Sequence, residues 1–97
     1  MGLESVVPRA APPALRPLLD VLAAAGLPST VAMADNVLQP PQAPPPEVWD
    51  DVRLRTPAGM VTLRRRPDGI AVLVFGNADA ALQAAQRTVA DAIRAAP

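Results

Sequence analysis

Arginine side chains form the main basic concentration in this sequence. Arg64, Arg65 and Arg66 are consecutive. Arg53 and Arg55 precede them by one predicted strand. A guanidinium is permanently charged and donates paired hydrogen bonds to carboxylates and phosphates, which indicates recognition of an anionic partner. On a strand, alternation would send Arg64 and Arg66 to one face and Arg65 to the other.

Three carboxylates, Glu47, Asp50 and Asp51, cluster shortly before these arginines. Paired carboxylates can bind a divalent cation or act as acid and base. No further ligand pattern accompanies them, so we interpret them as a solvated strand entry that can pair with nearby arginines. The sequence therefore predicts no metal site and no cofactor.

The residue types on which most enzymes depend are missing from the chain. It contains no histidine, cysteine, lysine or tyrosine. No side chain therefore has an unperturbed pKa between 5 and 8, and both Cys/His zinc sites and P-loops are excluded. Catalysis would depend on Asp, Glu, Arg, Ser or Thr, so we expect no catalytic residue and a non-enzymatic protein.

Length and charge narrow the class of protein further. The 97 residues suit one domain, and nine acidic residues balance nine basic ones. A net charge of zero does not favour binding to nucleic acid or to an anionic membrane. Residues 15–34 are fairly apolar, but Pro17, Asp20 and Pro28 interrupt them, so no membrane span is predicted. We expect a cytoplasmic protein.

Periodicity and breaker residues predict two helices. Apolar residues at helical spacing predict a helix over residues 14–25, with Gly26 as the residue that ends it. A second apolar stripe predicts a helix over residues 78–95, with Asn77 as its N-cap.

Two other segments lack such periodicity. We predict that residues 1–12 form a flexible N-terminal arm. Residues 13–97 then form a single α+β domain. Residues 39–46 read QPPQAPPP and predict a semi-rigid, proline-rich connector in polyproline II conformation. This segment matches the PxxP pattern of SH3 ligands, but no nearby arginine would orient such a ligand.

Two similar turns predict a sheet. Residues 56–59 read TPAG and residues 66–69 read RPDG, so both place proline second and glycine fourth. This pattern is typical of a three-residue hairpin loop that a glycine bulge closes. It joins the extended runs of residues 52–75 into a three-stranded antiparallel meander. In the expected register Thr56 faces Met60 and Arg66 faces Ile70.

This register divides the meander between two faces. The first face carries Val52, Leu54, Thr56, Met60, Thr62, Arg64, Arg66, Ile70, Val72 and Val74. The second carries Arg53, Arg55, Val61, Leu63, Arg65, Ala71, Leu73 and Phe75. We expect the first face to pack under the helices. The second face then exposes an apolar patch rimmed by charge, unless one helix covers each face and the arginines lie at the margin. The predicted partner-binding residues are Val61, Leu63, Leu73, Phe75, Arg53, Arg55 and Arg65.

The outer strand of the meander raises a further expectation. Residues 70–75 read IAVLVF, which is apolar on both faces, as is typical of an interior strand. We therefore expect another strand to cover its edge. Either residues 30–38 return through the connector as a fourth strand, or a second copy of the chain pairs there. Residues 29–38 themselves fit either a short strand or a helix.

The sequence thus predicts an α+β fold in which a small antiparallel sheet, with three or four strands, packs with an N-terminal and a C-terminal helix. The predicted function is a protein-interaction or assembly module that binds a protein partner or a second copy of itself. Nucleic-acid or anionic-ligand binding through the same arginines is the alternative, weakened because no aromatic stacking platform is present. A structural or chaperone-like accessory subunit is a third option. Residues 18–28, LLDVLAAAGLP, are similar to the first helix of dimeric α/β secretion chaperones, although those proteins are acidic.

Overall fold

Six strands and two helices make up the computed structural model, which describes residues 3–40 and 42–96. The strands are β1 (Leu3–Val7), β2 (Thr30–Ala34), β3 (Val37–Leu38), β4 (Asp51–Thr56), β5 (Gly59–Arg66) and β6 (Gly69–Val74). The helices are α1 (Leu15–Ala24) and α2 (Ala80–Ala95). All strand pairs are antiparallel, in the order β1-β6-β5-β4-β2-β3. The predicted α+β class is confirmed, with more strands than expected.

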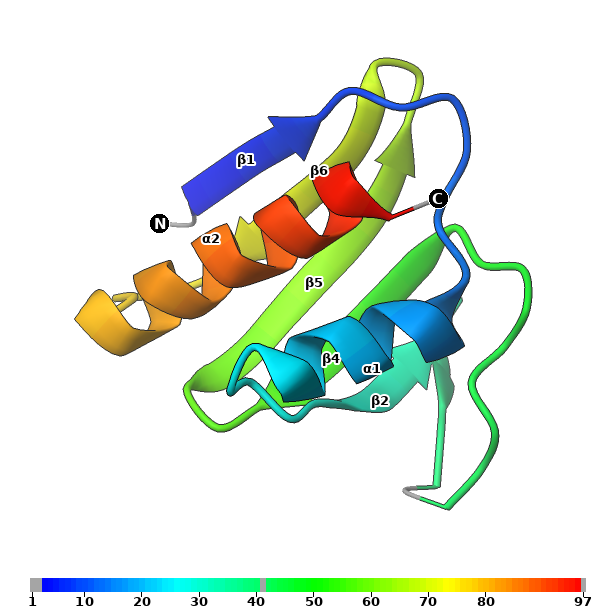
Figure 1. The fold of residues 1–97 in the computed structure, drawn as a ribbon, viewed down its shortest axis with the longest axis horizontal. Helices are drawn as coiled ribbons and strands as arrows, with labels where there is room; N and C mark the ends of the chain where they lie inside the picture. The colour runs from blue at the N-terminus through cyan, green and yellow to red at the C-terminus, as the bar shows by residue number, and fades with distance from the viewer. Residues whose placement is uncertain (1–2, 41, 97) are drawn as a thin grey trace.

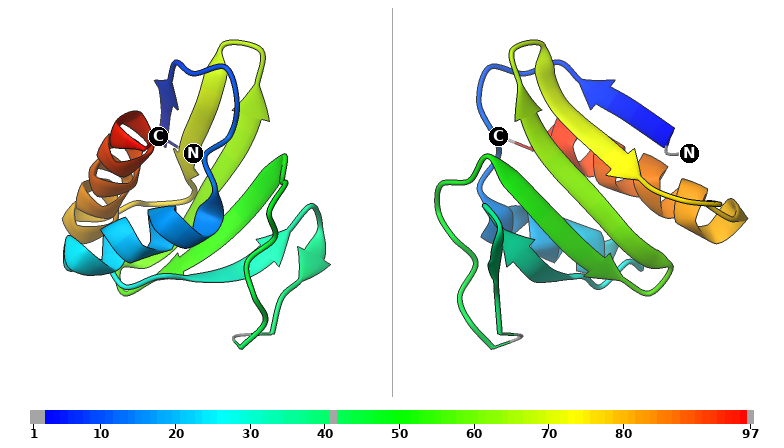
Figure 2. Two further views of the ribbon diagram at one scale, coloured as in Figure 1. Left: turned by 45° about the vertical axis from the view of Figure 1, so that its right-hand side comes forward. Right: turned by 180° about the vertical axis from the view of Figure 1, so that it is seen from behind.

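Both helices lie on the same face of the sheet (Figure 1). The view from behind shows the other face, over which no helix passes in the described part of the chain (Figure 2). We call this second side the uncovered face. An amphipathic helix buries one apolar stripe, so α1 and α2 together build a single core against a single side of the sheet.

Helix α1 ends where the sequence predicts. Leu15, Leu18 and Leu22 form its buried stripe. Gly26 has a φ of +83°, and the N–H of Leu27 donates to the carbonyl of Leu22 at 2.8 Å. This is a Schellman motif, in which glycine adopts the left-handed conformation and the chain leaves the helix.

Helix α2 is also confirmed, but its predicted cap is wrong. The Asp79 carboxylate, and not Asn77, accepts a hydrogen bond of 2.8 Å from the N–H of Leu82. Ala85, Val89 and Ile93 are buried under this helix. The helix begins two residues later than expected, because an aspartate next to the first turn both caps the helix and complements its dipole.

The structure corrects the prediction of a flexible N-terminal arm. Residues 3–7, expected within a flexible segment, form the edge strand β1 and pair with β6 over its length. The apolar strand β6 is therefore interior, as its composition indicates. The prediction that residues 30–38 cover the edge of β6 was wrong, because β2 pairs with β4 on the far side of the meander. Since β1 occupies the edge of β6, a second copy has no free edge to pair with there.

The hairpin register is the second correction. Thr56 pairs with Gly59 and Arg66 with Gly69, so each loop has two residues and each pairing is shifted by one position. Gly59 and Gly69 have φ values of +134° and +144°, which residues with a Cβ rarely adopt. Because side chains alternate along a strand, two successive shifts reverse β5 alone and leave β4 and β6 facing as predicted.

A buried tryptophan and a tight turn hold the connector in place. Trp49 follows the connector by three residues. Its side chain is only 1% exposed and anchors this part of the chain in the core. Asp35 and Asn36 form the two-residue β2–β3 turn with φ values of +48° and +67°. The Asp35 carboxylate accepts hydrogen bonds from the N–H groups of Asp50 and Asp51. These bonds join the residues that flank the connector and β3 on either side.

Candidate binding surface on the uncovered face

The uncovered face consists of the outward side chains of β4, β5 and β6. The register places Arg53, Arg55, Met60, Thr62, Arg64, Arg66, Ala71 and Leu73 on this side, and Phe75 follows at the end of β6. Its centre is closely packed, because Thr62, Ala71 and Leu73 are all buried although no helix lies over them. The exposed part of this face therefore lies at its periphery, in Arg53, Arg55, Met60 and Phe75.

The structure separates the seven predicted binding residues. Val61 and Leu63 are completely buried on the helix-covered side and cannot meet a partner. Arg65 lies on that side too, at the end of the sheet, where its guanidinium is 3.4 Å from the Asp50 carboxylate. The reversed strand β5 explains all three corrections. The remaining predicted residues, Arg53, Arg55, Leu73 and Phe75, share the uncovered face.

Two further arginines reach this face through the same reversal, and both are neutralised. Arg64 lies directly opposite Asp51 in the register, with Nε and a carboxylate oxygen 2.7 Å apart. Arg66 forms an ion pair with Glu4 of β1. Asp50 and Asp51 thus both pair with arginines of β5.

Arg53 and Arg55 differ from these arginines. Both side chains are exposed, and neither forms an ion pair with any residue in the described ranges. They project from the same strand at alternate positions, so their charges lie on one side of β4. On the uncovered face, the positive charge available to a partner is therefore concentrated along β4.

A shallow hollow adjoins these charges. Arg53, Met60, Thr62 and Phe75 line an open depression of about 320 Å³. Phe75 is 57% exposed and Met60 is 40% exposed, whereas Thr62 is buried. An apolar surface beside an unpaired guanidinium can accept an apolar side chain and a carboxylate at the same time.

Met60 and Thr62 were absent from the predicted site. The spacing of proline and glycine does not distinguish a three-residue loop from a two-residue loop. The exposure of Met60 was therefore hidden by the assumed register. The composition of β5 offered a signal, because Val61 and Leu63 are the branched aliphatic pair that best suits a core position.

Other kinds of site find no support in the described ranges. Residues 3–40 and 42–96 contain no group of three or more acidic side chains that could hold a metal ion. Neither of the helices described has the length and apolar character needed to cross a bilayer.

A scan of protein-family models, a search of curated proteins and a search of solved structures each find no match to this chain.

Proposed function

We propose that this protein is a non-enzymatic interaction module that binds an acidic, partly apolar segment of a partner protein on its uncovered face. One observation carries the proposal: the unpaired Arg53 and Arg55 lie beside the exposed apolar side chains of Met60 and Phe75. Burial of apolar surface would supply affinity, and the guanidinium groups would select and orient carboxylates.

Charge favours a different protein over a second copy as the occupant. In a two-fold symmetric dimer the same patch meets itself, so Arg53 and Arg55 of the two copies would approach one another. Like charges brought together in an interface are unfavourable unless acids intervene. The acids on this side, Glu4 and Asp51, are already paired within the chain. Self-association through this face is therefore the weaker form of the proposal.

Nucleic-acid binding is the second candidate, because Arg53, Arg55, Arg64 and Arg66 all share the uncovered face. Ion pairs neutralise the latter two arginines. Phe75 is the only exposed aromatic side chain in the described ranges, since Trp49 is buried. Proteins that bind single strands stack successive bases on several aromatic rings, so protein binding remains the preferred proposal.

The test uses two designed peptides, one alternating glutamate with leucine and one alternating lysine with leucine. Each is titrated into the isotope-labelled full chain and followed by amide chemical shifts. We expect the glutamate peptide alone to shift amides of β4, β5 and β6. Arg55→Glu should weaken its binding by about tenfold or more, which corresponds to about 1.4 kcal/mol.

Arg87→Glu is the matched control. Arg87 is an exposed arginine of α2 without an ion pair in the described ranges, so the variant has the same net charge but an intact uncovered face. Equal binding of both peptides, or equal loss in both variants, would contradict the proposal. Steeply salt-dependent binding of an oligothymidylate that Arg55→Glu abolishes would favour the nucleic-acid alternative. A dimer in sedimentation that Phe75→Ser dissociates would favour self-association.

A further inference from the structure

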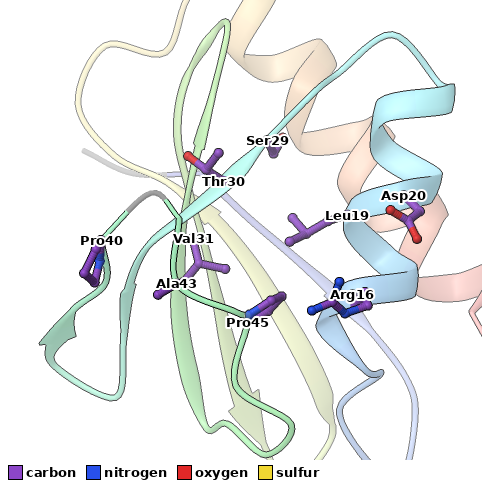
Figure 3. Close-up of a pocket in the computed structure, with 9 residues that line it drawn as sticks. All are labelled: Arg16, Leu19, Asp20, Ser29, Thr30, Val31, Pro40, Ala43 and Pro45. Atoms are coloured by element: carbon purple, nitrogen blue, oxygen red, sulfur yellow. The ribbon is translucent and has the colours of Figure 1, made fainter.

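A second hollow lies on the other side of the sheet, beside the first residues of β2. It has a volume of about 200 Å³ and lies between α1, the start of β2 and the proline-rich connector. Figure 3 shows Arg16 and Leu19 reaching from α1 toward Pro45 and Val31. The hollow shares no lining residue with the depression on the uncovered face, so it is a separate site.

One part of the wall of this hollow is apolar and stiff. Leu19 and Val31 belong to the side of α1 and β2 that packs on the core, and Pro45 closes the hollow from the connector. Proline restricts the backbone to a narrow range of φ, and Trp49 anchors the end of this segment. A wall that is ordered before a ligand arrives reduces the entropy lost on binding.

Two opposite charges lie at the rim. Arg16 and Asp20 are one turn apart on α1, and both are exposed. They form no ion pair with each other or with another described residue. Ser29 lines the same hollow and contributes a hydroxyl. Its Oγ donates to the carbonyl of Leu27 at 2.9 Å, which leaves its lone pairs free to accept.

Helix stability does not account for these charges. A cation in the first turn is opposed by the helix dipole, and α1 has no acidic residue in that turn to offset Arg16. An arginine placed four residues before an aspartate is also the less favourable order for such a pair. Arg16 and Asp20 are therefore poorly placed to stabilise α1 but well placed to meet a ligand.

We propose that this hollow binds a small zwitterion with an aliphatic side chain, of the α-amino-acid class. The ligand carboxylate meets the Arg16 guanidinium in a bidentate contact. Its ammonium group meets the Asp20 carboxylate. Side chains one turn apart have Cβ atoms about 5–6 Å apart, which suits two charges carried on one carbon and its neighbour. The aliphatic side chain then packs between Leu19, Val31 and Pro45.

The test titrates L-leucine into the isotope-labelled full chain and follows amide chemical shifts. We expect a saturable response confined to α1, the start of β2 and the connector. Isovalerate lacks the ammonium group and isopentylamine lacks the carboxylate, so each should bind about tenfold more weakly than leucine. Arg16→Gln and Asp20→Asn should each weaken leucine binding by about fivefold or more.

Arg87→Gln serves as the control and should leave leucine binding unchanged. Thermal unfolding of each variant confirms that the fold is retained, since all three positions are exposed. An absence of saturable shifts up to about 50 mM leucine, a bound of about 2 kcal/mol in affinity, would overturn the proposal. Equal binding of isovalerate and leucine would also overturn it, because the site would then recognise only an anion.

Discussion

The indole Nε1 of Trp49 donates a hydrogen bond of 3.0 Å to the carbonyl oxygen of Pro13, 36 positions earlier in the chain. This bond joins the residues that follow the proline-rich connector to the segment just before α1. The tryptophan is also among the largest fully buried side chains of the core. One residue thus fixes the relative position of α1 and β4, and with it the frame of the hollow beneath the connector.

Loss of this anchor should be costly. We expect Trp49→Ala to lower the free energy of unfolding by about 3–5 kcal/mol, because it leaves a cavity and an unpaired carbonyl. Trp49→Phe should have a smaller effect. Urea denaturation measures both. The neighbouring Val48 is 82% exposed, so Val48→Ala should change stability by no more than about 0.5 kcal/mol. Similar losses at positions 48 and 49 would contradict this account.

Gly69 allows the end of β1 to lie close to the β5–β6 turn, because glycine has no Cβ. A Cβ at this position would overlap the carbonyl of Val7 and the Cα of Pro8. We expect Gly69→Ala to destabilise the protein by more than about 2 kcal/mol and to release β1 from β6. Hydrogen exchange should show faster exchange at the amides of β1.

Gly76 provides the matched comparison. Its φ is +76°, but a Cβ there would meet no atom within 4 Å. Gly76→Ala should therefore lose only about 1 kcal/mol, from backbone strain alone. Equal losses for the two glycine variants, or unchanged exchange in β1 of Gly69→Ala, would refute the role of close packing at Gly69.

Gln86 links α2 to the sheet from within the core. Its Nε2 donates to the carbonyls of Leu3 at 3.2 Å and Val72 at 2.9 Å. Gln86→Leu leaves both carbonyls without this donor and should cost about 1–3 kcal/mol in denaturant unfolding. Gln83→Leu removes a half-buried bond to Ala78 near the start of α2 and should cost less. A stabilising effect of Gln86→Leu would show that apolar burial outweighs these bonds.

Arg9 stabilises the end of α2 from outside the helix. Its Nη1 donates to the carbonyls of Ile93 at 2.8 Å and Ala96 at 3.3 Å. A cation at a helix C-terminus satisfies free carbonyls and complements the helix dipole. Arg9→Gln should therefore lower the free energy of unfolding by about 1–2 kcal/mol, measured by thermal unfolding. Arg87→Gln in the middle of the same helix should be nearly neutral. Equal melting temperatures for the two variants would contradict this role.

Local signals sufficed for much of the fold. The sequence predicted the apolar stripes of α1 and α2 and the glycine after α1, because these features depend on residues within one or two turns. The apolar composition of β6 correctly indicated an interior strand. Asp79 shows the limit of such signals, since Asn77 and Asp79 are both good caps and the structure uses Asp79.

The partner-binding prediction shows where local reasoning ended. Arg53, Arg55, Leu73 and Phe75 were grouped correctly because β4 and β6 face as expected. Val61, Leu63 and Arg65 were grouped incorrectly because β5 is reversed between them. A register error of one residue exchanges the two faces of a strand, although it hardly changes the sequence signal.

The sequence alone determined that this chain forms two amphipathic helices and an antiparallel meander, and that an arginine-rich face accompanies the sheet. Only the tertiary structure decided that β1 covers β6, that both helices share one side, and that Arg53 and Arg55 form no ion pair within residues 3–40 and 42–96. The physical reason is that helices and turns depend on neighbouring residues. Strand partners and ion pairs instead depend on residues that meet only after the chain has folded.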